Sequence, residues 1–172
     1  MKILAQIILV SFLTILLFSP KFFEQTPKLR QNVQSAKTSL CQASGVLPDP
    51  NCTPGSINQD VTQENIYQTV CKKGYTKTIR PPVNYTENLK IEQIKEYGYP
   101  DTSLRDYEED HLIPLELGGN PSDPKNLWPE PLNTAHQKDE IENLCNKKVC
   151  NEVLNLEEAQ KEIASNWQAA CH

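Results

Sequence analysis

The sequence has few histidines, glycines and aromatic residues. Of its 172 residues, 3 are histidine and 6 are glycine, and 7% are aromatic. Imidazole chemistry is therefore confined to His111, His136 and the terminal His172. The cysteines form no C-x-x-C pair, and the spacing from Cys145 to Cys150 does not fit a short zinc knuckle. We therefore reject a structural four-cysteine zinc site.

Positive charge is also scarce. The chain carries 17 Lys and Arg against 22 Asp and Glu, and its formal net charge is -5. This balance argues against a protein that coats nucleic acid through many phosphate contacts, because such binding depends on Lys and Arg. It does not exclude a nuclease, since a bound divalent cation can supply positive charge where the chemistry takes place.

The longest apolar run covers residues 3–19, with Lys2 before it and Pro20 and Lys21 after it. This pattern is typical of an export signal. The run is also long enough to cross a bilayer, for which roughly 17 residues suffice. We expect residues 1–23 to be a signal peptide or an uncut membrane anchor, and the only membrane contact. The protein is then secreted, periplasmic or held at the cell surface.

All six cysteines follow this apolar run. An even number of cysteines behind an export signal predicts disulfide bonds. The sequence does not choose among the pairings, and our preference is Cys52 with Cys71, which would tie the start of the domain to its first helix. Residues 24–50 are polar and lack apolar periodicity, which predicts a flexible tether. The folded domain is therefore expected at residues 51–172.

The periodicity of the apolar residues predicts a mixed α+β domain. The expected elements are a short helix from Asp60 or Thr62 to Val70, a strand over 74–80, a helix over 89–97, a strand over 107–117, an extended segment at 126–128, a helix from Thr134 and a last helix over 156–167. Thr134 and Gln137 have the spacing of a capping box. Trp128 and Trp167 are expected in the core.

Three segments carry the residues best suited to chemistry. They are D-H-L-I-P-L-E-L-G-G (110–119), N-L-W (126–128) and A-H-Q-K-D (135–139). In order and approximate spacing they resemble the HNH, or His-Me finger, endonucleases. A closer resemblance covers nearly everything after the tether and is to small exported bacterial proteins described as HNH-like. It rests on PDPNCTPG, VTQENI, TVCKKGYTKTIRPP, YEEDHLIPLELGG, NLWPEP, HQKDEIE and the final L-x-x-AQ-x-x-IA-x-x-W.

The resemblance implies a ββα-metal core with additional helices, and metal-dependent hydrolysis of DNA or RNA phosphodiester bonds. His111 would be the general base, because the pKa of a neutral imidazole lies near working pH. Asp110 and His136 would hold a divalent metal, most readily Mg²⁺, with Mn²⁺, Ca²⁺ or Zn²⁺ as alternatives. Asn126 would orient the His111 ring.

Four further residues are candidates for substrate contact or support of the site. Lys138 or Arg80 would touch phosphate, Glu116 would join the site, and Asp139 would replace His136 as the metal ligand. Simpler interpretations stay open for two of them: Lys138 as a solvated helix charge and Glu116 as an exposed strand carboxylate.

The pair Asp110 and His111 also has a simpler interpretation, as a buried structural pair. Neighbouring residues of a regular strand point to opposite faces. Both can therefore face a metal only at a strand end or a bulge. Two other functions also stay open: a non-catalytic cell-envelope binding module on a ββα-metal scaffold, and a hydrolase of another phosphodiester or of a cell-wall substrate. The sequence predicts no protein partner.

Overall fold

The computed structural model describes residues 40–172. The signal or anchor expected over 1–23, and most of the tether expected over 24–50, lie outside this range. Within the described range, no helix has the length and apolar character needed to cross a membrane.

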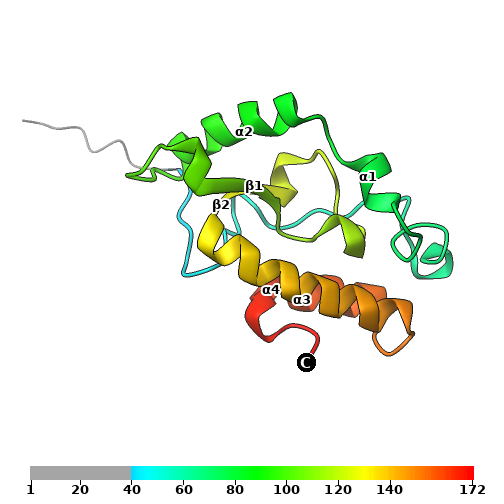
Figure 1. Ribbon diagram of the computed structural model, residues 1–172. Coiled ribbons are helices and arrows are strands. Elements are labelled where there is room, and N and C mark those ends of the chain that lie inside the picture. Colours follow the sequence, from blue (N-terminus) through cyan, green and yellow to red (C-terminus); the bar gives the residue numbers. More distant parts are fainter. Residues whose placement is uncertain (1–39) are drawn as a thin grey trace, which may run out of the picture. The chain divides into compact units, whose positions relative to one another are not determined.

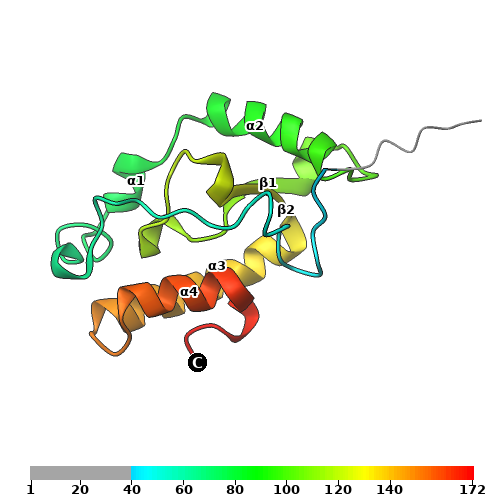
Figure 2. The same cartoon turned by 180° about the vertical axis from the view of Figure 1, so that it is seen from behind.

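Residues 40–172 form a mixed α+β domain, as the sequence predicts. Its helices and strands are α1 (Tyr75–Ile79), α2 (Val83–Glu96), β1 (Tyr107–His111), β2 (Leu127–Pro131), α3 (Leu132–Cys150) and α4 (Leu156–Asn166). Short 3-10 turns lie at Gln63–Asn65, Leu104–Asp106, Leu115–Leu117, Pro124–Asn126 and Trp167–Ala169. Figures 1 and 2 show α2 on one side of the two strands and α3 with α4 on the other.

The two strands pair antiparallel, with Tyr107 opposite Pro131 and His111 opposite Leu127. Because each strand has one neighbour, Pro129 in β2 breaks no central ladder. The strand expected over 107–117 ends at His111. Pro114 then precedes a 3-10 turn, so the chain beyond His111 leaves the sheet.

The last two helices follow the expected pattern. In α4 the buried residues Leu156, Ala159 and Ile163 lie on one face, and Asn155 caps the helix by accepting from the Glu157 backbone N–H. Helix α3 begins at Leu132, earlier than expected. The Thr134 hydroxyl donates to the Pro131 carbonyl at 2.8 Å, so it lies in the first turn, and the predicted capping box is wrong.

The strand expected over 74–80 is wrong, because this segment forms helix α1. Gly74 precedes the helix with φ at +85°, a left-handed conformation that glycine adopts readily. The Tyr, Thr and Ile side chains that suggested a strand have only a weak preference for strands, and tertiary packing overrides it. The helix expected up to Val70 is a single 3-10 turn at Gln63–Asn65, followed by turns.

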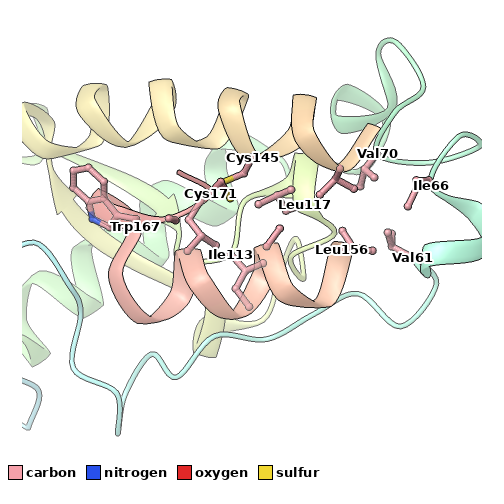
Figure 3. Close-up of a cluster of buried hydrophobic side chains, with 13 residues drawn as sticks. Val61, Ile66, Val70, Ile113, Leu117, Cys145, Leu156, Trp167 and Cys171 are labelled. Atoms are coloured by element: carbon pink, nitrogen blue, oxygen red, sulfur yellow. A yellow bond between two sulfur atoms is a disulfide. The ribbon is translucent and has the colours of Figure 1, made fainter. Parts of the chain in front are cut away.

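The main hydrophobic core lies between α3, α4 and the loop that follows β1 (Figure 3). Ile113 and Leu117 of that loop pack against Ile163 of α4 and its neighbours. Trp128 and Trp167 are 1% and 2% exposed, which confirms that both are core residues. The loop after β1 is therefore held by apolar contacts as well as by polar ones.

Three disulfides join Cys41 to Cys52, Cys71 to Cys150 and Cys145 to Cys171. The predicted Cys52–Cys71 pair is wrong, because each of these cysteines has a different partner. Three disulfides fit an oxidising compartment.

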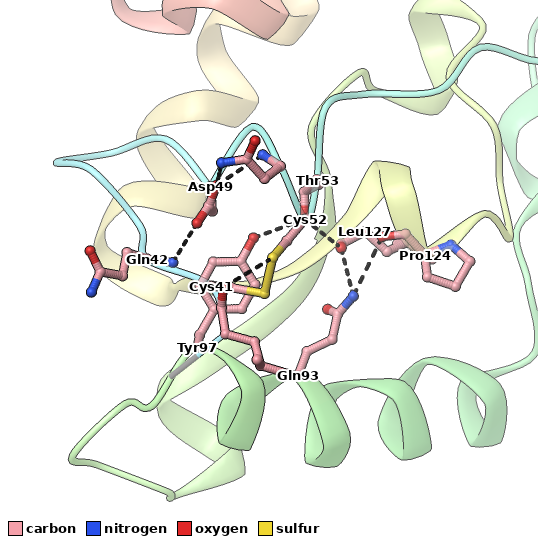
Figure 4. Close-up of a disulfide and its surroundings, with 11 residues drawn as sticks. Cys41, Gln42, Asp49, Cys52, Thr53, Gln93, Tyr97, Pro124 and Leu127 are labelled. Atoms are coloured by element: carbon pink, nitrogen blue, oxygen red, sulfur yellow. Dashed lines mark hydrogen bonds between the residues drawn. A yellow bond between two sulfur atoms is a disulfide. The ribbon is translucent and has the colours of Figure 1, made fainter. Parts of the chain in front are cut away.

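The first disulfide joins Cys41, in the segment that the sequence assigned to the tether, to Cys52 of the predicted domain (Figure 4). Cys41 is 3% exposed, and its backbone N–H donates to the Glu96 carbonyl at the end of α2. The Asp49 carboxylate accepts from the backbone N–H of Gln42 at 2.8 Å. Residues 41–50 therefore pack with the domain, and the boundary predicted at residue 51 is too late.

Candidate functional site

His111 is the last residue of β1 and is 4% exposed. Its Nε2 lies 3.0 Å from the carbonyl oxygen of Pro121. A carbonyl oxygen only accepts hydrogen bonds, so in the neutral ring Nε2 carries the hydrogen and donates it to Pro121. The Nδ1 atom then keeps its lone pair and is the basic nitrogen of the ring.

Burial lowers the pKa of His111, because the charged imidazolium is more poorly solvated inside the protein than in water. The hydrogen bond to Pro121 and the negative charge of Asp110 oppose this shift and do not reverse it. The ring is therefore neutral at pH 7. A neutral imidazole with a fixed tautomer is the state that a general base requires.

A pocket of about 310 Å³ opens beside His111, at the lower end of the size range of ligand-binding pockets. It lies between β1 and the start of α2. Its charged and polar walls come from Arg80, Thr86, Glu87, Lys90, Tyr107, Glu108, Glu109 and His111. The structure therefore places Arg80, one of the expected phosphate contacts, in the same pocket as the expected base.

A short basic segment leads into this pocket. Lys72, Lys73, Lys77 and Arg80 are all exposed, and residues 71–81 contain no acidic side chain. Lys77 lies in α1, and Arg80 directly follows that helix. Although the whole chain is negatively charged, the segment that ends at the pocket residue Arg80 is locally positive.

Asn126 forms no hydrogen bond with the His111 ring, contrary to expectation. It is fully buried, and its amide spans the loop after β1. Its Nδ2 donates to the carbonyls of Ile113 and Asn120, at 2.9 and 3.1 Å, and its Oδ1 accepts from the Ile113 N–H at 3.0 Å. Since Asn120 directly precedes Pro121, Asn126 positions the carbonyl that holds His111 and acts on the ring only through it.

Asp110 and His111 point to opposite faces of β1, as a regular strand requires. Asp110 faces α3, where its Oδ2 lies 2.7 Å from the Nζ of Lys138. Lys138 is 1% exposed and so is neither a solvated helix charge nor available to a phosphate in the pocket. The strand ends at His111, as the metal hypothesis required, but this does not bring the two side chains to one face.

His136 lies apart from Asp110. It is exposed on α3, two residues before Lys138. Two residues of an α-helix differ by about 200° of rotation, so His136 points away from the side that carries Lys138 and meets Asp110. Asp139 is also exposed. Among residues 40–172, no three His, Cys, Asp or Glu side chains are grouped so as to hold a metal ion. The expected metal pair Asp110 and His136 therefore does not fit this structure.

Two buried glutamates beside the site were not expected from the sequence. Burial raises the pKa of Glu109 and of Glu130 to about 9 in each case, so both are neutral acids at pH 7. The negative charge of the neighbouring Asp110 also raises the pKa of Glu130, and both oxygens of the buried Glu130 carboxyl lack a hydrogen-bond partner. The sequence did contain one signal for Glu109. Side chains two residues apart on a strand lie on the same face, so Glu109 shares the face of β1 that carries His111.

Glu116 is the remaining candidate. It lies in the 3-10 turn at Leu115–Leu117 and not on a strand, and it is partly buried. Burial, together with the negative charge of Asp139, raises the pKa of its carboxyl group. Its backbone carbonyl accepts from Asn146 of α3 at 2.6 Å, which ties the turn to the helix. Glu116 does not line the pocket that contains His111.

Comparisons with models of protein families, with curated proteins and with solved structures found no match to this chain. A function must therefore be argued from the geometry. The structure brings His111 and Arg80 to one pocket, and it places Asp110 and Lys138 on the opposite face of the same strand end.

Proposed function

We propose that this domain is an exported hydrolase of phosphodiester bonds in DNA or RNA, of the HNH endonuclease kind, with His111 as general base. The observation that carries the proposal is the His111 ring, which is buried, neutral and fixed by the Pro121 carbonyl at the wall of a pocket. The consecutive order of β1, β2 and α3 supports a core of the ββα type. The three disulfides support an exported location.

In this proposal a water molecule loses a proton to Nδ1 of His111, and its oxygen attacks the phosphorus. The ester P–O bond then breaks, and the leaving oxygen takes up a proton from solvent. Arg80, at the pocket wall, stabilises the negative charge of the phosphate. Asn126 is a positioning residue, because it holds the loop that carries Pro121.

A divalent metal is not part of these steps. The resemblance implies Mg²⁺ or a related ion held by Asp110 and His136, but His136 points away from the side of α3 that meets Asp110. The proposal therefore commits to the residues of the pocket alone.

Replacing His111 by alanine tests the proposal. We expect hydrolysis by the full chain to fall by about 10² to 10⁴, the usual contribution of a general base. In the unchanged protein, activity needs the neutral ring. Because the pKa of His111 is lowered, activity should be flat near pH 7 and fall only below the ordinary histidine pKa of about 6.5. The measurement is the pH profile of kcat/KM on an oligonucleotide.

His136→Ala is the matched control, because this histidine is exposed and lies outside the pocket. It should leave the rate unchanged. A His111→Ala protein that is folded and cleaves as fast as the unchanged protein would contradict the assignment of the base. The same conclusion follows if the acid limb of the profile lies above the ordinary histidine pKa.

The basic segment gives a second expected result. Replacing Lys72, Lys73 and Lys77 together by alanine should weaken binding of an oligonucleotide and leave hydrolysis of a small aryl phosphodiester unchanged. For each lysine that contacts a phosphate, the slope of log affinity against log salt should decrease by roughly 1. Lys95→Ala is the control, since Lys95 is exposed near the far end of α2. Equal salt slopes in all three proteins would show that the segment does not contact the polymer.

A non-catalytic binding module is the second candidate. The observation that favours it is the separation of Asp110 from His136, since a scaffold without its metal ligands would lose a metal-dependent activity. This candidate predicts that the full chain binds a nucleic acid or an envelope polymer and cleaves neither, whichever divalent cation is added.

A further inference from the structure

Lys138 lies at the contact between α3 and the end of β1, and its ammonium group is enclosed by protein. Its Nζ donates to Asp110 Oδ2 at 2.7 Å, to the backbone carbonyl of His111 at 2.8 Å, and to Oε1 of Glu142 one turn further along the helix. An ammonium group has three N–H donors, and all three are used. The side chain is 1% exposed, so no solvent reaches it.

The charges around this ammonium are balanced by protein groups. Burial by itself lowers the pKa of Lys138, but the carboxylates of Asp110 and Glu142 outweigh it and raise that pKa above its ordinary value. Burial raises the pKa of Glu142 to about 7, and Glu130 is neutral. Lys138 is thus a buried ammonium group whose two side-chain partners are the acidic groups of Asp110 and Glu142.

A metal ion bound to Asp110 would need the same space. Divalent cations bind carboxylate oxygens at about 2.0 to 2.6 Å, and the Lys138 Nζ already lies 2.7 Å from Oδ2. We propose that the Lys138 ammonium occupies the position beside Asp110 that the HNH resemblance assigns to a divalent metal, so that the site is assembled without a metal ion. The lysine is a positioning residue, because it fixes Asp110 and the backbone of His111 and does not face the pocket.

The inference concerns the cation beside Asp110, and it holds whether or not the pocket hydrolyses phosphodiesters. It is therefore tested by ion binding and by unfolding of the full chain, with no measurement of activity. Failure of hydrolysis would count against the proposed function alone. Binding of a metal at Asp110 would count against this inference alone.

The first experiment is a Mn²⁺ titration followed by the electron paramagnetic resonance signal of free Mn²⁺. We expect the unchanged protein and Asp110→Asn to bind the same number of ions. The unfolding temperature of the unchanged protein should be the same in Mn²⁺ and in a chelator. One additional ion bound by the unchanged protein, with a stabilisation that Asp110→Asn lacks, would overturn the inference.

The second experiment replaces Lys138 by methionine, which keeps an unbranched side chain and removes the charge. Removing one partner of a buried ion pair should lower the unfolding temperature by about 10 °C or more. Mn²⁺ should restore part of that loss, because Asp110 and Glu142 then face each other without a cation.

Lys161→Met is the matched control. Lys161 forms the same i,i+4 pair with a glutamate, Glu157, but both side chains are 73% exposed. Such pairs contribute little to stability, so the unfolding temperature should hardly change and should not respond to Mn²⁺. A Lys138→Met protein as stable as Lys161→Met, or one that Mn²⁺ leaves unchanged, would overturn the inference. If Lys138→Met does not fold, the Mn²⁺ titration of the unchanged protein and of Asp110→Asn tests the inference.

Discussion

Gly119→Ala should unfold the loop that holds His111. A Cβ atom at this position would lie 1.7 Å from the carbonyl oxygen of Ile113 and 2.8 Å from Nδ2 of Asn126. The first contact is with backbone, which no rotation of a side chain can relieve. The backbone at residue 119 and the backbone at Ile113 would therefore have to separate.

Separation would also break the buried hydrogen bonds of Asn126. Its Nδ2 donates to the Ile113 carbonyl, the same atom that the new methyl group would meet. Each buried polar group left without a partner costs about 1 to 3 kcal/mol, and overpacking adds about 1 to 3 kcal/mol. We expect a loss of about 4 kcal/mol in the free energy of unfolding, a large part of the roughly 5 to 15 kcal/mol that stabilises a typical domain.

Gly74→Ala is the control for this prediction. Gly74 has φ at +85°, so alanine is strained there, but no atom lies within 4 Å of the added Cβ. Its cost should be about 1 to 2 kcal/mol, the usual penalty for a left-handed residue. Urea unfolding of the full chains measures both. Equal unfolding midpoints would mean that the loop moves freely and that Asn126 does not hold the Pro121 carbonyl in place.

The sequence predicts the order of elements around the site better than their contacts. The extended segment before α3, the helix over 156–167 and the burial of both tryptophans follow from local patterns, because apolar residues recur with the period of each element. The sharp turn at Gly118 and Gly119 also has a local signal. These features depend on neighbours in the chain.

The partners of Asp110 illustrate what could not be predicted. On α3, His136 and Lys138 are two residues apart, which is enough to place them on opposite sides of the helix. Which of them meets Asp110 depends on how the helix packs against β1, and a motif does not encode that rotation. The start of α3 at Leu132 directly follows Pro131, the residue that ends β2. The buried state of Lys138 follows from packing and has no counterpart in the composition.

The disulfide pairing could not be predicted from the sequence either, because it depends on which distant segments of the chain meet in the fold. Cys71 and Cys150 are 79 residues apart in sequence and have Cα atoms 5.6 Å apart in the structure. Their bond ties the segment before α1 to the end of α3. It therefore links the basic segment to the helix that carries Lys138.

Replacing Cys71 and Cys150 together by serine should cause the larger stability loss of two disulfide variants. A cross-link restricts the unfolded chain more when it closes a longer loop. For this separation the chain-entropy relation gives about 4.5 kcal/mol, against about 2.8 kcal/mol for the pair Cys41 and Cys52, which are 11 residues apart. Cys71 and Cys150 are only partly buried, so serine at these positions removes the cross-link without burying two hydroxyl groups.

Urea unfolding of the two double-serine variants, both as full chains, measures the difference. Cys41→Ser with Cys52→Ser is the control, because it removes a disulfide at the edge of the domain that holds residues 41–50. We also expect the variant without the Cys71–Cys150 bond to lose oligonucleotide affinity, since the segment before α1 is then tied down only by non-covalent contacts. If the control variant were the less stable of the two, loop closure would not be the main contribution of these bonds. Packing of residues 41–50 against α2 would then contribute more than the cross-link between the segment before α1 and the end of α3.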